Sequence, residues 1–288
     1  MSELGSILLQ AGKEKWAVPH FNVSDFEILK AVVEAAVETR APLMIGTSEG
    51  ERNFLGLTEA VALVKSFRDD KKIPIFLNAD HTKSPEAAKK AVDAGYDSIH
   101  IDLSAAAFPQ NIAGTKEVVE YARAKNKNIS VEGELGYLRG ESKVQNEKIQ
   151  VRPEDLTNPF EATKFVSETG VYRFAPAVGN IHGLSLREGA LDIERIRAIR
   201  KALPDEIAIV LHAGSGVPID QIQDAIYAGV SNIHVSTELR VAFKEALDAS
   251  LHKNEGEAAP YKIMALPVEA VKQKAIEKIK LFGAEGKM

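Results

Sequence analysis

The strongest constraint in this sequence is an alternation of short β-rich runs with amphipathic stretches that continues along almost the whole chain. This alternation is expected of repeated βα units around a parallel sheet. Several of the β-rich runs are apolar on both faces, as buried parallel strands tend to be. Eight units are present, and eight parallel strands close a barrel. The expected strands are Ala17–Asn22, Pro42–Thr47, Ile73–Ala79, Asp97–Asp102, Asn128–Glu134, Tyr172–Val178, Glu206–His212 and Asn232–Ser236.

Between these strands, apolar residues recur at three- and four-residue spacing, which predicts amphipathic helices. One more charged amphipathic helix, Leu266–Leu281, follows the last unit, and we expect it to cover a barrel end or a neighbouring subunit. The polar stretch Gly136–Thr157 has little periodicity, so we expect a long loop on the functional face. The other expected helices are Phe26–Thr39, Thr58–Phe67, Pro85–Ala94, Asn111–Lys125, Pro159–Glu168, Asp192–Leu203 and Pro218–Ala228.

These features predict an α/β fold, a (β/α)₈ TIM barrel with an extra C-terminal helix. A chain of 288 residues fits one barrel of this kind, so we expect residues 1–288 to form a single domain.

Composition narrows the classes of partner. The net charge is −5 and no basic block is present, so neither nucleic acid nor a membrane surface is an expected partner. No apolar run approaches the roughly 20 residues that span a bilayer, and Met1–Gly12 does not resemble an export signal. The chain has no cysteine, so a transition-metal site would have to use His, Asp or Glu. We expect a cytoplasmic protein that acts on a small molecule.

Histidines gather where the expected strands end, and active sites of such barrels form at those ends. His81, His182 and His212 follow the third, sixth and seventh strands. Three imidazoles converging on the barrel mouth would make an open metal site, and neutral nitrogen ligands suit zinc. A lone strand histidine is as often a hydrogen-bonded residue of the barrel interior, but three at strand ends favour a metal site.

The remaining histidines are less informative. His100 shares strand parity with Asp102 but lies two residues deeper, so a structural role is the better interpretation. His20, in the first strand, is undecided. His252 falls in a charged helix, where we expect it to be solvated.

Carboxylates also occupy strand ends. Glu132 and Glu134 point to one face of the fifth strand, so both can enter the mouth. Either one could bind the metal, accept a proton or hold a ligand histidine in its tautomer. Asp80 precedes His81, a good position for a general acid or base.

The loops after strands seven and eight carry small and hydroxylated residues. Many barrels bind phosphate in these two loops, with backbone amides and a helix N-terminus. Gly214 lets the backbone approach an anion, and Ser215, Ser236 and Thr237 can add hydroxyl donors. The Ala-Gly-Ser-Gly segment alone would more often be a plain turn, but its place after His212 favours a phosphate site.

No expected strand end carries a lysine that could form a Schiff base with a substrate carbonyl. Lys71 and Lys72 precede the third strand and would lie at the opposite end of the barrel. Carbanion chemistry in such a mouth would therefore need electrostatic stabilisation, for which a metal ion is the available electrophile.

With these residues in view, the sequence resembles the class II, zinc-dependent ketose-bisphosphate aldolases, which include fructose- and tagatose-bisphosphate aldolases. The resemblance runs almost end to end, and ordered motifs at matching strand ends are more specific than any one of them. The motifs are Pro19–Val23, Ser48–Gly50, Asp80-His81, Ile101-Asp102, Val131–Gly136, Gly179–Gly183, Leu211–Gly216, Ser236–Arg240 and Leu281–Lys287.

The resemblance implies that His81, His182 and His212 bind one catalytic Zn²⁺ that stabilises the negative charge developing on the substrate. It implies that Asp80 donates the proton to the aldehyde oxygen. Asp102 and Glu134 match positions where relatives hold a second or alternative metal.

The resemblance also implies a substrate pocket. The pocket for the dihydroxyacetone phosphate end matches Gly183, Ser215, Ser236 and Thr237, with Ala213 and Gly214 in the same loop. Asn22 and Ser48 match positions close to the substrate.

Four departures from the family pattern fall in the mouth. Ala213 replaces a glycine and narrows the approach to the phosphate. His234 stands where an asparagine contacts the reacting part of the substrate, and Leu186 replaces a lysine. Ser142 takes the place of a glutamate that serves in proton abstraction, with Glu141 one residue earlier. We therefore include Glu141 and His234 among the expected catalytic residues.

The function expected from these observations is reversible aldol cleavage of a ketose bisphosphate, with fructose 1,6-bisphosphate as the first candidate substrate. Two alternatives stay open. One is a zinc-dependent aldolase or isomerase that acts on another sugar phosphate or a non-bisphosphate ketose, and the other is a metabolite-binding or scaffold protein on a decayed barrel. By analogy with the family, we expect a homodimer or homotetramer.

Overall fold

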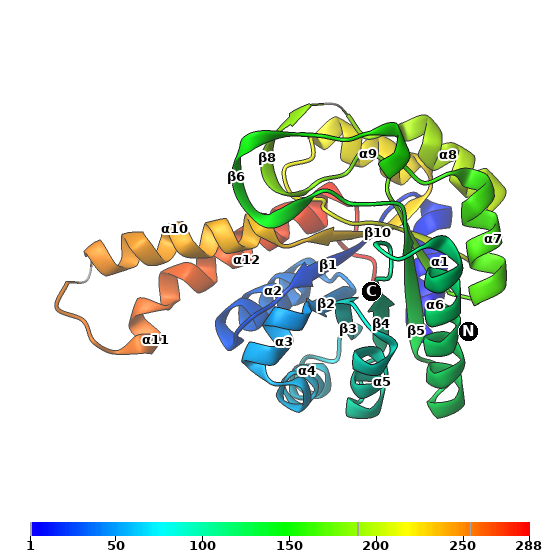
Figure 1. The fold of residues 1–288 in the computed structure, drawn as a ribbon. Coiled ribbons are helices and arrows are strands. Elements are labelled where there is room, and N and C mark those ends of the chain that lie inside the picture. The colour runs from blue at the N-terminus through cyan, green and yellow to red at the C-terminus, as the bar shows by residue number, and fades with distance from the viewer. Residues whose placement is uncertain (1, 189, 254) are drawn as a thin grey trace.

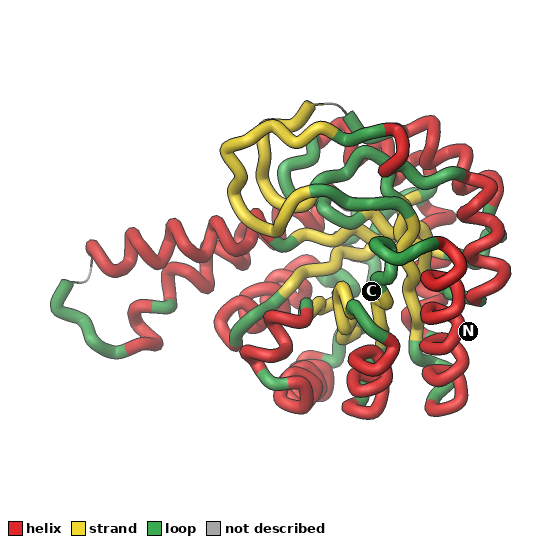
Figure 2. Tube along the Cα trace, in the orientation of Figure 1, coloured by secondary structure: helices red, strands yellow, loops and turns green. Residues whose placement is uncertain are grey.

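Eight parallel strands close into a barrel in the computed structural model, which describes residues 2–188, 190–253 and 255–288 but not the side chains of 146–148 and 185–188. The strand order around the barrel is β1-β10-β9-β7-β5-β4-β3-β2, and helices surround it (Figures 1 and 2). The predicted (β/α)₈ barrel is confirmed. The barrel strands are β1 (Val18–Asn22), β2 (Leu43–Thr47), β3 (Ile75–Thr82), β4 (Ser98–Ile101), β5 (Ser130–Leu135), β7 (Arg173–Pro176), β9 (Ala208–Leu211) and β10 (Val230–Val235).

The predicted helices are also present, with ends that shift by a few residues. Their apolar faces pack on the outside of the barrel strands and bury most of the hydrophobic core. The helices after the first strand are α2 (Phe26–Thr39), α3 (Glu49–Leu55), α4 (Leu57–Lys71), α5 (Pro85–Ala94), α6 (Phe108–Lys125), the 3₁₀ turn η1 (Pro153–Asp155), α7 (Pro159–Thr169), α8 (Ile193–Ala202), α9 (Ile219–Ala228), α10 (Thr237–Lys253), α11 (Pro260–Ile263) and α12 (Ala265–Leu281).

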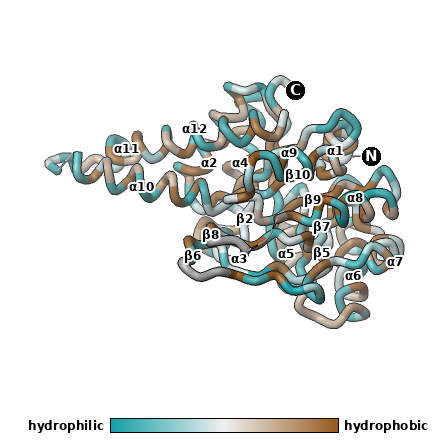
Figure 3. Tube along the Cα trace, turned by 90° about the horizontal axis from the view of Figure 1, so that it is seen from above, coloured by the Kyte–Doolittle hydropathy of each residue, from teal (hydrophilic) through white to brown (hydrophobic). Residues whose placement is uncertain are grey.

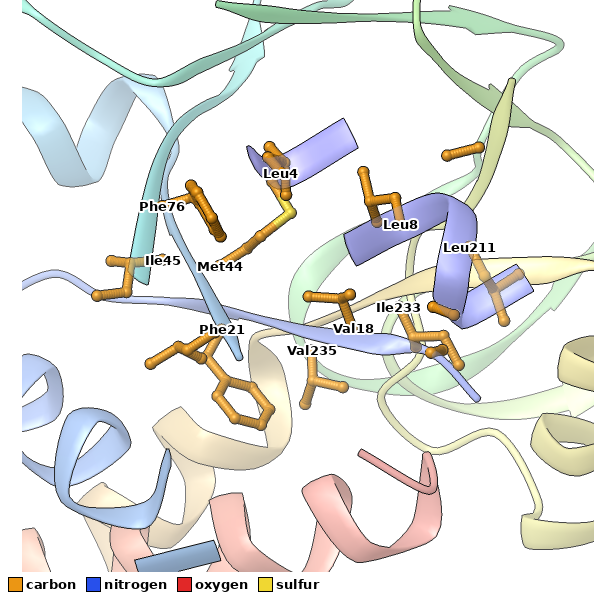
Figure 4. Close-up of a cluster of buried hydrophobic side chains, with 14 of the residues drawn as sticks. Leu4, Leu8, Val18, Phe21, Met44, Ile45, Phe76, Leu211, Ile233 and Val235 are labelled. Atoms are coloured by element: carbon orange, nitrogen blue, oxygen red, sulfur yellow. The ribbon is translucent and has the colours of Figure 1, made fainter. Parts of the chain in front are cut away.

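A helix that the sequence analysis did not predict, α1 (Glu3–Glu14), covers the N-terminal end of the barrel. Its N-cap is Ser2, whose side chain accepts a hydrogen bond from the Gly5 amide. Leu4 and Leu8, four residues apart, are buried, and Figure 4 shows them beside Met44 and other core side chains. The barrel end is therefore closed by apolar contacts.

The stretch expected to be a long loop contains a strand instead, so that expectation was wrong. Strand β6 (Gly140–Gln150) pairs in parallel with β8 (His182–Glu188), and together they form a two-stranded sheet that we call the flap. Strand β8 lies some forty positions after β6 in the chain, so local periodicity gives little indication that β6 is a strand. The flap lies beyond the C-terminal ends of the barrel strands (Figure 1).

Helices α10, α11 and α12 form an arm that extends away from the barrel (Figures 1 and 3). The C-terminal helix was expected to cover a barrel end or a neighbouring subunit. It packs along α10 and against α2, on the side of the barrel rather than over a barrel end. The contact with a neighbouring subunit stays a prediction. Within the described chain, none of the helices is both long and apolar enough to cross a bilayer.

Candidate active site

A pocket of about 190 Å³ opens at the C-terminal ends of the barrel strands, between these ends and the flap. A larger cavity of about 780 Å³ lies at the opposite end, beside α1. Among the described residues, however, the clusters of His, Asp and Glu that could hold a metal all lie near the smaller pocket. The structure brings most of the predicted site residues together. The pocket is lined by Asn22, Ser48, Asp80, His81, Ser142, His182, Gly183, His212, Ala213, Ser215, His234, Ser236, Thr237 and Arg240.

The imidazole of His81 lies at the centre of a histidine cluster. Its ring centroid is 4.7 Å from that of His212, 5.0 Å from that of His182 and 4.6 Å from that of His100. His81, His100 and His212 belong, with Asp80, to one group whose ligand atoms lie within 4.8 Å of one another. No such group among the described residues includes His182, although its ring lines the same pocket.

His81 owes its position to an irregularity in β3. The register between β3 and β4 shifts between Ala79 and Thr82, and His81 has φ 42°, in the left-handed region that side chains other than glycine rarely adopt. Its amide donates to His100 Nδ1 at 3.1 Å, and its own Nδ1 lies 2.8 Å from Asp102 Oδ2. The bulge therefore turns the imidazole into the mouth, where two neighbours hold it.

Asp80 is buried beside this imidazole. Asn22 Nδ2 donates to Asp80 Oδ2 at 3.0 Å, and the other oxygen, Oδ1, lies 3.4 Å from Nδ1 of both His100 and His234. Burial would raise the pKa of Asp80, but the charge of His81 holds it well below its ordinary value. Asp80 is thus an ionised carboxylate with one oxygen turned toward the pocket residues.

Glu132 lies deeper and does not line the pocket. Its Oε1 is 2.6 Å from His212 Nε2, and its Oε2 is 2.5 Å from Arg173 Nη1. Burial would raise the pKa of Glu132, but the Arg173 guanidinium and the neighbouring histidines hold it well below its ordinary value. Of the roles left open for this carboxylate, holding a histidine in one tautomer is the one that this contact favours.

The donors at the mouth suit a divalent cation. Four carboxylates lie at the cluster, and within the described chain only Arg173 and Lys83 pair with them as permanent cations, which leaves two negative charges. Burial lowers the pKa of His81 and His100, but the surrounding carboxylates outweigh it and raise both. One divalent ion would balance the two negative charges that remain. The carboxylates are Asp80, Asp102, Glu132 and Glu134.

The surroundings of the other two proposed ligand histidines favour the neutral imidazole. Burial, with His81 nearby, lowers the pKa of His182 to about 3, and burial also holds the pKa of His212 well below its ordinary value. Neutral imidazoles have the lone pair that a metal ion needs.

The structure also places the histidines that the sequence left undecided. His20 lies opposite His234 in the β1–β10 pairing, and their rings stack at 3.5 Å. Gly46 leaves the room for this, because a Cβ at that position would come within 2.1 Å of the His20 ring. His100 is buried and contacts His81. His252 is exposed, as expected.

Small and hydroxylated residues line the pocket in the loops that follow β9 and β10. Ser215 Oγ accepts from the amides of Ser236 and Glu238, at 3.3 and 3.4 Å, and so joins the two loops. Ser236 Oγ is buried and has no hydrogen-bond partner among the described residues. Helix α10 begins at Thr237. A helix N-terminus, an unpartnered hydroxyl and a joined pair of loops are what an anion site requires.

The backbone of this loop shows what two of its residues do. Ala213 has φ 57°, so a residue with a Cβ stands where the backbone favours glycine. Gly214 does not line the pocket. Its amide donates to the His234 carbonyl at 2.8 Å, and a Cβ there would come within 2.7 Å of Ile233 Cγ2, so it serves close packing.

One residue of the flap, Glu141, behaves differently from expectation. Glu141 is exposed and pairs with Lys143 at 2.6 Å, so the structure does not bring it into the pocket. Its neighbour Ser142 lines the pocket. A Cβ at Gly183 would come within 2.2 Å of the Glu141 carbonyl, so Gly183 also allows β8 to pack on β6. The side chain of Leu186 lies outside the described part of the chain.

Sequence reasoning gave no role to Arg240, which lines the pocket from the first turn of α10. Its Nη2 is 2.5 Å from Glu51 Oε1, and its Nη1 donates to the Ser142 carbonyl at 2.9 Å. Glu51 also accepts from Asn22 Nδ2 at 2.9 Å. The position of Arg240 in the motif after the eighth strand was the available signal. The residue ties the flap to the barrel mouth.

Lys83 corrects one premise of the sequence analysis. We expected no lysine at a strand end, but Lys83 directly follows β3 and pairs with Asp102. Partial burial lowers the pKa of Lys83, but the charge of Asp102 outweighs it and raises the pKa. A Schiff-base lysine needs the opposite shift, and Lys83 does not line the pocket.

Known proteins resemble this chain over almost its whole length. A family model described as fructose-bisphosphate aldolase class-II matches residues 2–287. A fructose-bisphosphate aldolase of Geobacillus stearothermophilus is 36% identical over 98% of this chain and 96% of its own, and one of Staphylococcus aureus strain Mu50 is 34% identical over the same shares. The crystal structure of the YdjI aldolase from Escherichia coli K12 covers 100% of this chain and 99% of its own, with a TM-score of 0.83 and 29% identity.

Proposed function

Since this chain belongs to the class II fructose-bisphosphate aldolase family, whose members are aldehyde-lyases, we propose that it catalyses the metal-dependent, reversible aldol cleavage of a ketose bisphosphate. The proposed substrate is fructose 1,6-bisphosphate, and the products would be dihydroxyacetone phosphate and glyceraldehyde 3-phosphate. The observation that carries the proposal is that His81, His182 and His212 line one pocket at the barrel mouth together with Asp80.

In this proposal the three imidazoles hold a zinc ion, and Asp102 and Glu134 provide a second or alternative metal position. The ion, when bound, would polarise the ketose carbonyl and stabilise the negative charge that bond cleavage leaves on the substrate. Asp102 orients His81 through the contact at Nδ1, and Glu132 orients His212 through Nε2. Both contacts belong to the kind that fixes a ligand histidine in one tautomer.

Asp80 is the proposed proton carrier. In the cleavage direction, its ionised carboxylate accepts the proton of the substrate hydroxyl whose carbon becomes the aldehyde, and in condensation it returns the proton to the aldehyde oxygen. Asn22 holds one oxygen of Asp80, which leaves the other for the substrate. His234 lies beside that free oxygen and would take part in positioning the same hydroxyl.

The phosphate of the dihydroxyacetone end is proposed to bind at the N-terminus of α10. Ser236 Oγ, Ser215 and Thr237 supply donors there, and Gly183 permits close approach on the flap side.

A second candidate is aldol cleavage or isomerisation of a sugar that carries a single phosphate. Arg240 is the only arginine or lysine that lines the pocket in the described chain, and it already pairs with Glu51. A second phosphate would therefore have to compete with Glu51 for one guanidinium.

The test is a retro-aldol assay of the purified protein on fructose and tagatose 1,6-bisphosphates and on the corresponding 1-phosphates, combined with metal analysis. We expect removal of metal with a chelator to abolish cleavage, zinc to restore it, and borohydride with substrate to trap no covalent adduct. His81→Ala should lose both zinc and activity, whereas His252→Ala, a change at an exposed histidine, should lose neither. Cleavage that survives complete metal removal, or an adduct on Lys83, would refute the metal mechanism. A preference for a monophosphate would favour the second candidate.

We also propose that the protein is a cytoplasmic homodimer or homotetramer. The arm carries exposed apolar side chains that would suit a subunit contact, among them Leu251, Tyr261 and Leu266.

A further inference from the structure

Arg173 is a fully buried arginine inside the barrel that the proposed mechanism does not use. Its side chain enters from β7, and its guanidinium meets polar atoms from several other barrel strands. A guanidinium carries five N–H donors, accepts no hydrogen bond and does not lose its proton in proteins. Every partner of Arg173 must therefore present an acceptor. The partners are Glu132 Oε2, Asn78 Oδ1, Ser98 Oγ, Ser130 Oγ and Asn232 Oδ1.

The first connection runs through Glu132 to His212. Arg173 Nη1 donates to Glu132 Oε2 at 2.5 Å, and the positive guanidinium favours the ionised carboxylate, whose oxygens can only accept hydrogen bonds. The other oxygen lies 2.6 Å from His212 Nε2. His212 must therefore carry its proton on Nε2, which leaves the lone pair on Nδ1.

The second connection runs through Asn78 to His20. Asn78 Oδ1 accepts from Arg173 Nη2 at 3.0 Å and from Ser98 Oγ at 2.8 Å, which fixes the orientation of the amide. Asn78 Nδ2 therefore faces His20 Nε2, at 3.0 Å, and donates to it. His20 must carry its proton on Nδ1, the tautomer opposite to that of His212.

The third connection runs through Asn232 to His234. Asn232 Nδ2 donates to the Val18 carbonyl at 2.9 Å, and Oδ1 faces Arg173 Nη1 at 3.4 Å. The same oxygen lies 3.2 Å from His234 Nε2. His234 must donate from Nε2, so its Nδ1 carries a lone pair.

We infer that Arg173 is a positioning residue that fixes the tautomers of three buried imidazoles through Glu132, Asn78 and Asn232. Arg173 does not line the pocket, and none of its hydrogen bonds in the described chain goes to an imidazole. Each of these imidazoles has its Nε2 within hydrogen-bond distance of one of these three side chains, so that side chain favours one tautomer.

The arrangement has a consequence for the substrate, which rests on the proposed function. With its proton on Nε2, His234 turns a lone pair toward Asp80 Oδ1, 3.4 Å away, and neither atom has a hydrogen-bond partner among the described residues. Two acceptors this close require a donor from the ligand. A substrate hydroxyl is such a donor, and it would bind where Asp80 can take its proton.

The tautomers can be read directly from the ¹⁵N chemical shifts of histidine-labelled, metal-free protein. We expect protonated Nε2 in His212 and His234 and protonated Nδ1 in His20. Arg173→Met should leave His20 and His234 as mixtures of tautomers. The matched control is Arg200→Met, which removes a partly buried arginine that donates to the Leu203 and Ile207 carbonyls. The control should leave all three histidines unchanged. Unchanged tautomers in Arg173→Met would overturn the inference.

Arg173→Met leaves Glu132 as a buried charge without its partner and could fail to fold. A second pair of variants avoids this difficulty because the substituted side chains keep their shape. In Asn78→Asp the new group can only accept, so His20 must move its proton from Nδ1 to Nε2. In Asn232→Asp the group facing His234 is still an acceptor, so His234 should keep its proton on Nε2. A His20 that stays protonated on Nδ1 in Asn78→Asp contradicts the inference.

Zinc affinity, measured by competition with a chelator, gives a readout that does not depend on turnover. Outer-shell changes typically cost about 10–100-fold in metal affinity, and we expect a loss in this range for Arg173→Met and none for Arg200→Met. Equal affinities in the two variants would show that Arg173 does not act on the metal site. Because the tautomers are measured without metal or substrate, failure of the proposed aldolase activity would leave this result standing.

Discussion

The two ends of the barrel are built from the same eight strands but solve opposite problems. At the N-terminal end, α1 covers the strands with buried leucines, and polar groups such as Asp97 are paired, in this case with Arg68 at 2.5 Å. At the mouth, His81 has a strained backbone and several buried polar atoms have no hydrogen-bond partner. Of such atoms in the described residues, only Arg200 Nε lies away from the barrel interior and its mouth.

The difference shows that contacts at the N-terminal end stabilise the fold, whereas the mouth contains groups that destabilise it and serve function. Unpartnered buried acceptors cost free energy unless a ligand supplies the missing donor or cation. Strain in the backbone of His81 likewise persists only because neighbours hold it. We therefore expect changes at the mouth to affect turnover and changes at the closed end to affect the free energy of unfolding.

The largest effect is expected for Asp80→Asn. Loss of the carboxylate that carries the proton should lower kcat by about 10²–10⁴-fold, because general acid–base catalysis contributes an effect of this size. The zinc content should not change. Asp97→Asn makes the same chemical change at the closed end, where the carboxylate binds Arg68 and the Leu77 amide, and should lower stability while leaving kcat intact. Steady-state kinetics with metal analysis would decide, and similar losses of kcat in both variants would contradict the division between the two ends.

Leu8→Ala tests the closed end in the opposite sense. Leu8 lies on the buried face of α1, so its truncation leaves a cavity and should lower the free energy of unfolding by about 2–5 kcal/mol. The kcat of the folded protein should stay the same. Gln10→Ala, on an exposed position of the same helix, should change stability by no more than about 0.5 kcal/mol. Urea denaturation measures both, and a fall in kcat for Leu8→Ala would show that the two ends are coupled.

The smallest effect is expected for Ala213→Gly. Alanine in the left-handed region, as at Ala213, costs about 1–2 kcal/mol of stability. Glycine avoids this cost, but the greater conformational entropy of its unfolded chain lowers stability by about 0.5–1 kcal/mol. We expect a net gain in stability of about 0.5–1 kcal/mol, seen as a higher urea midpoint. Gly214→Ala, next to it, should be destabilising because its Cβ would meet Ile233 and the His234 carbonyl. A loss of stability in Ala213→Gly would mean that the strain at this position is negligible.

The sequence predicted the parts of the site that depend on local periodicity. The strand ends follow from the alternation of βα units, and all C-terminal ends of a parallel barrel meet at one mouth. For this reason Asp80, His81, His182 and His212 could be assigned to one pocket before the structure was known. Glu141 shows the limit of reasoning from local periodicity. Whether its side chain faces the pocket or solvent depends on how β6 pairs with β8.

Other features had a weak local signal or none. Helix α1 has apolar residues at helical spacing, but only the barrel end explains why it is there. The flap needs a partner strand that lies far along the chain. The role of His20 depends on its register with His234 and on the room left by Gly46. Lys83 shows that a shift of a few residues in a strand end can place a charge at the mouth.

The sequence by itself thus determined the barrel and the chemical types of residue at its mouth, because the period of the strands and helices is a local property of the chain. The tertiary structure decided which polar atoms face each other across the barrel, and through Arg173 it constrains which nitrogen of a buried histidine carries the proton. These are contacts between strands far apart in sequence, and a pattern along one chain does not contain their distances.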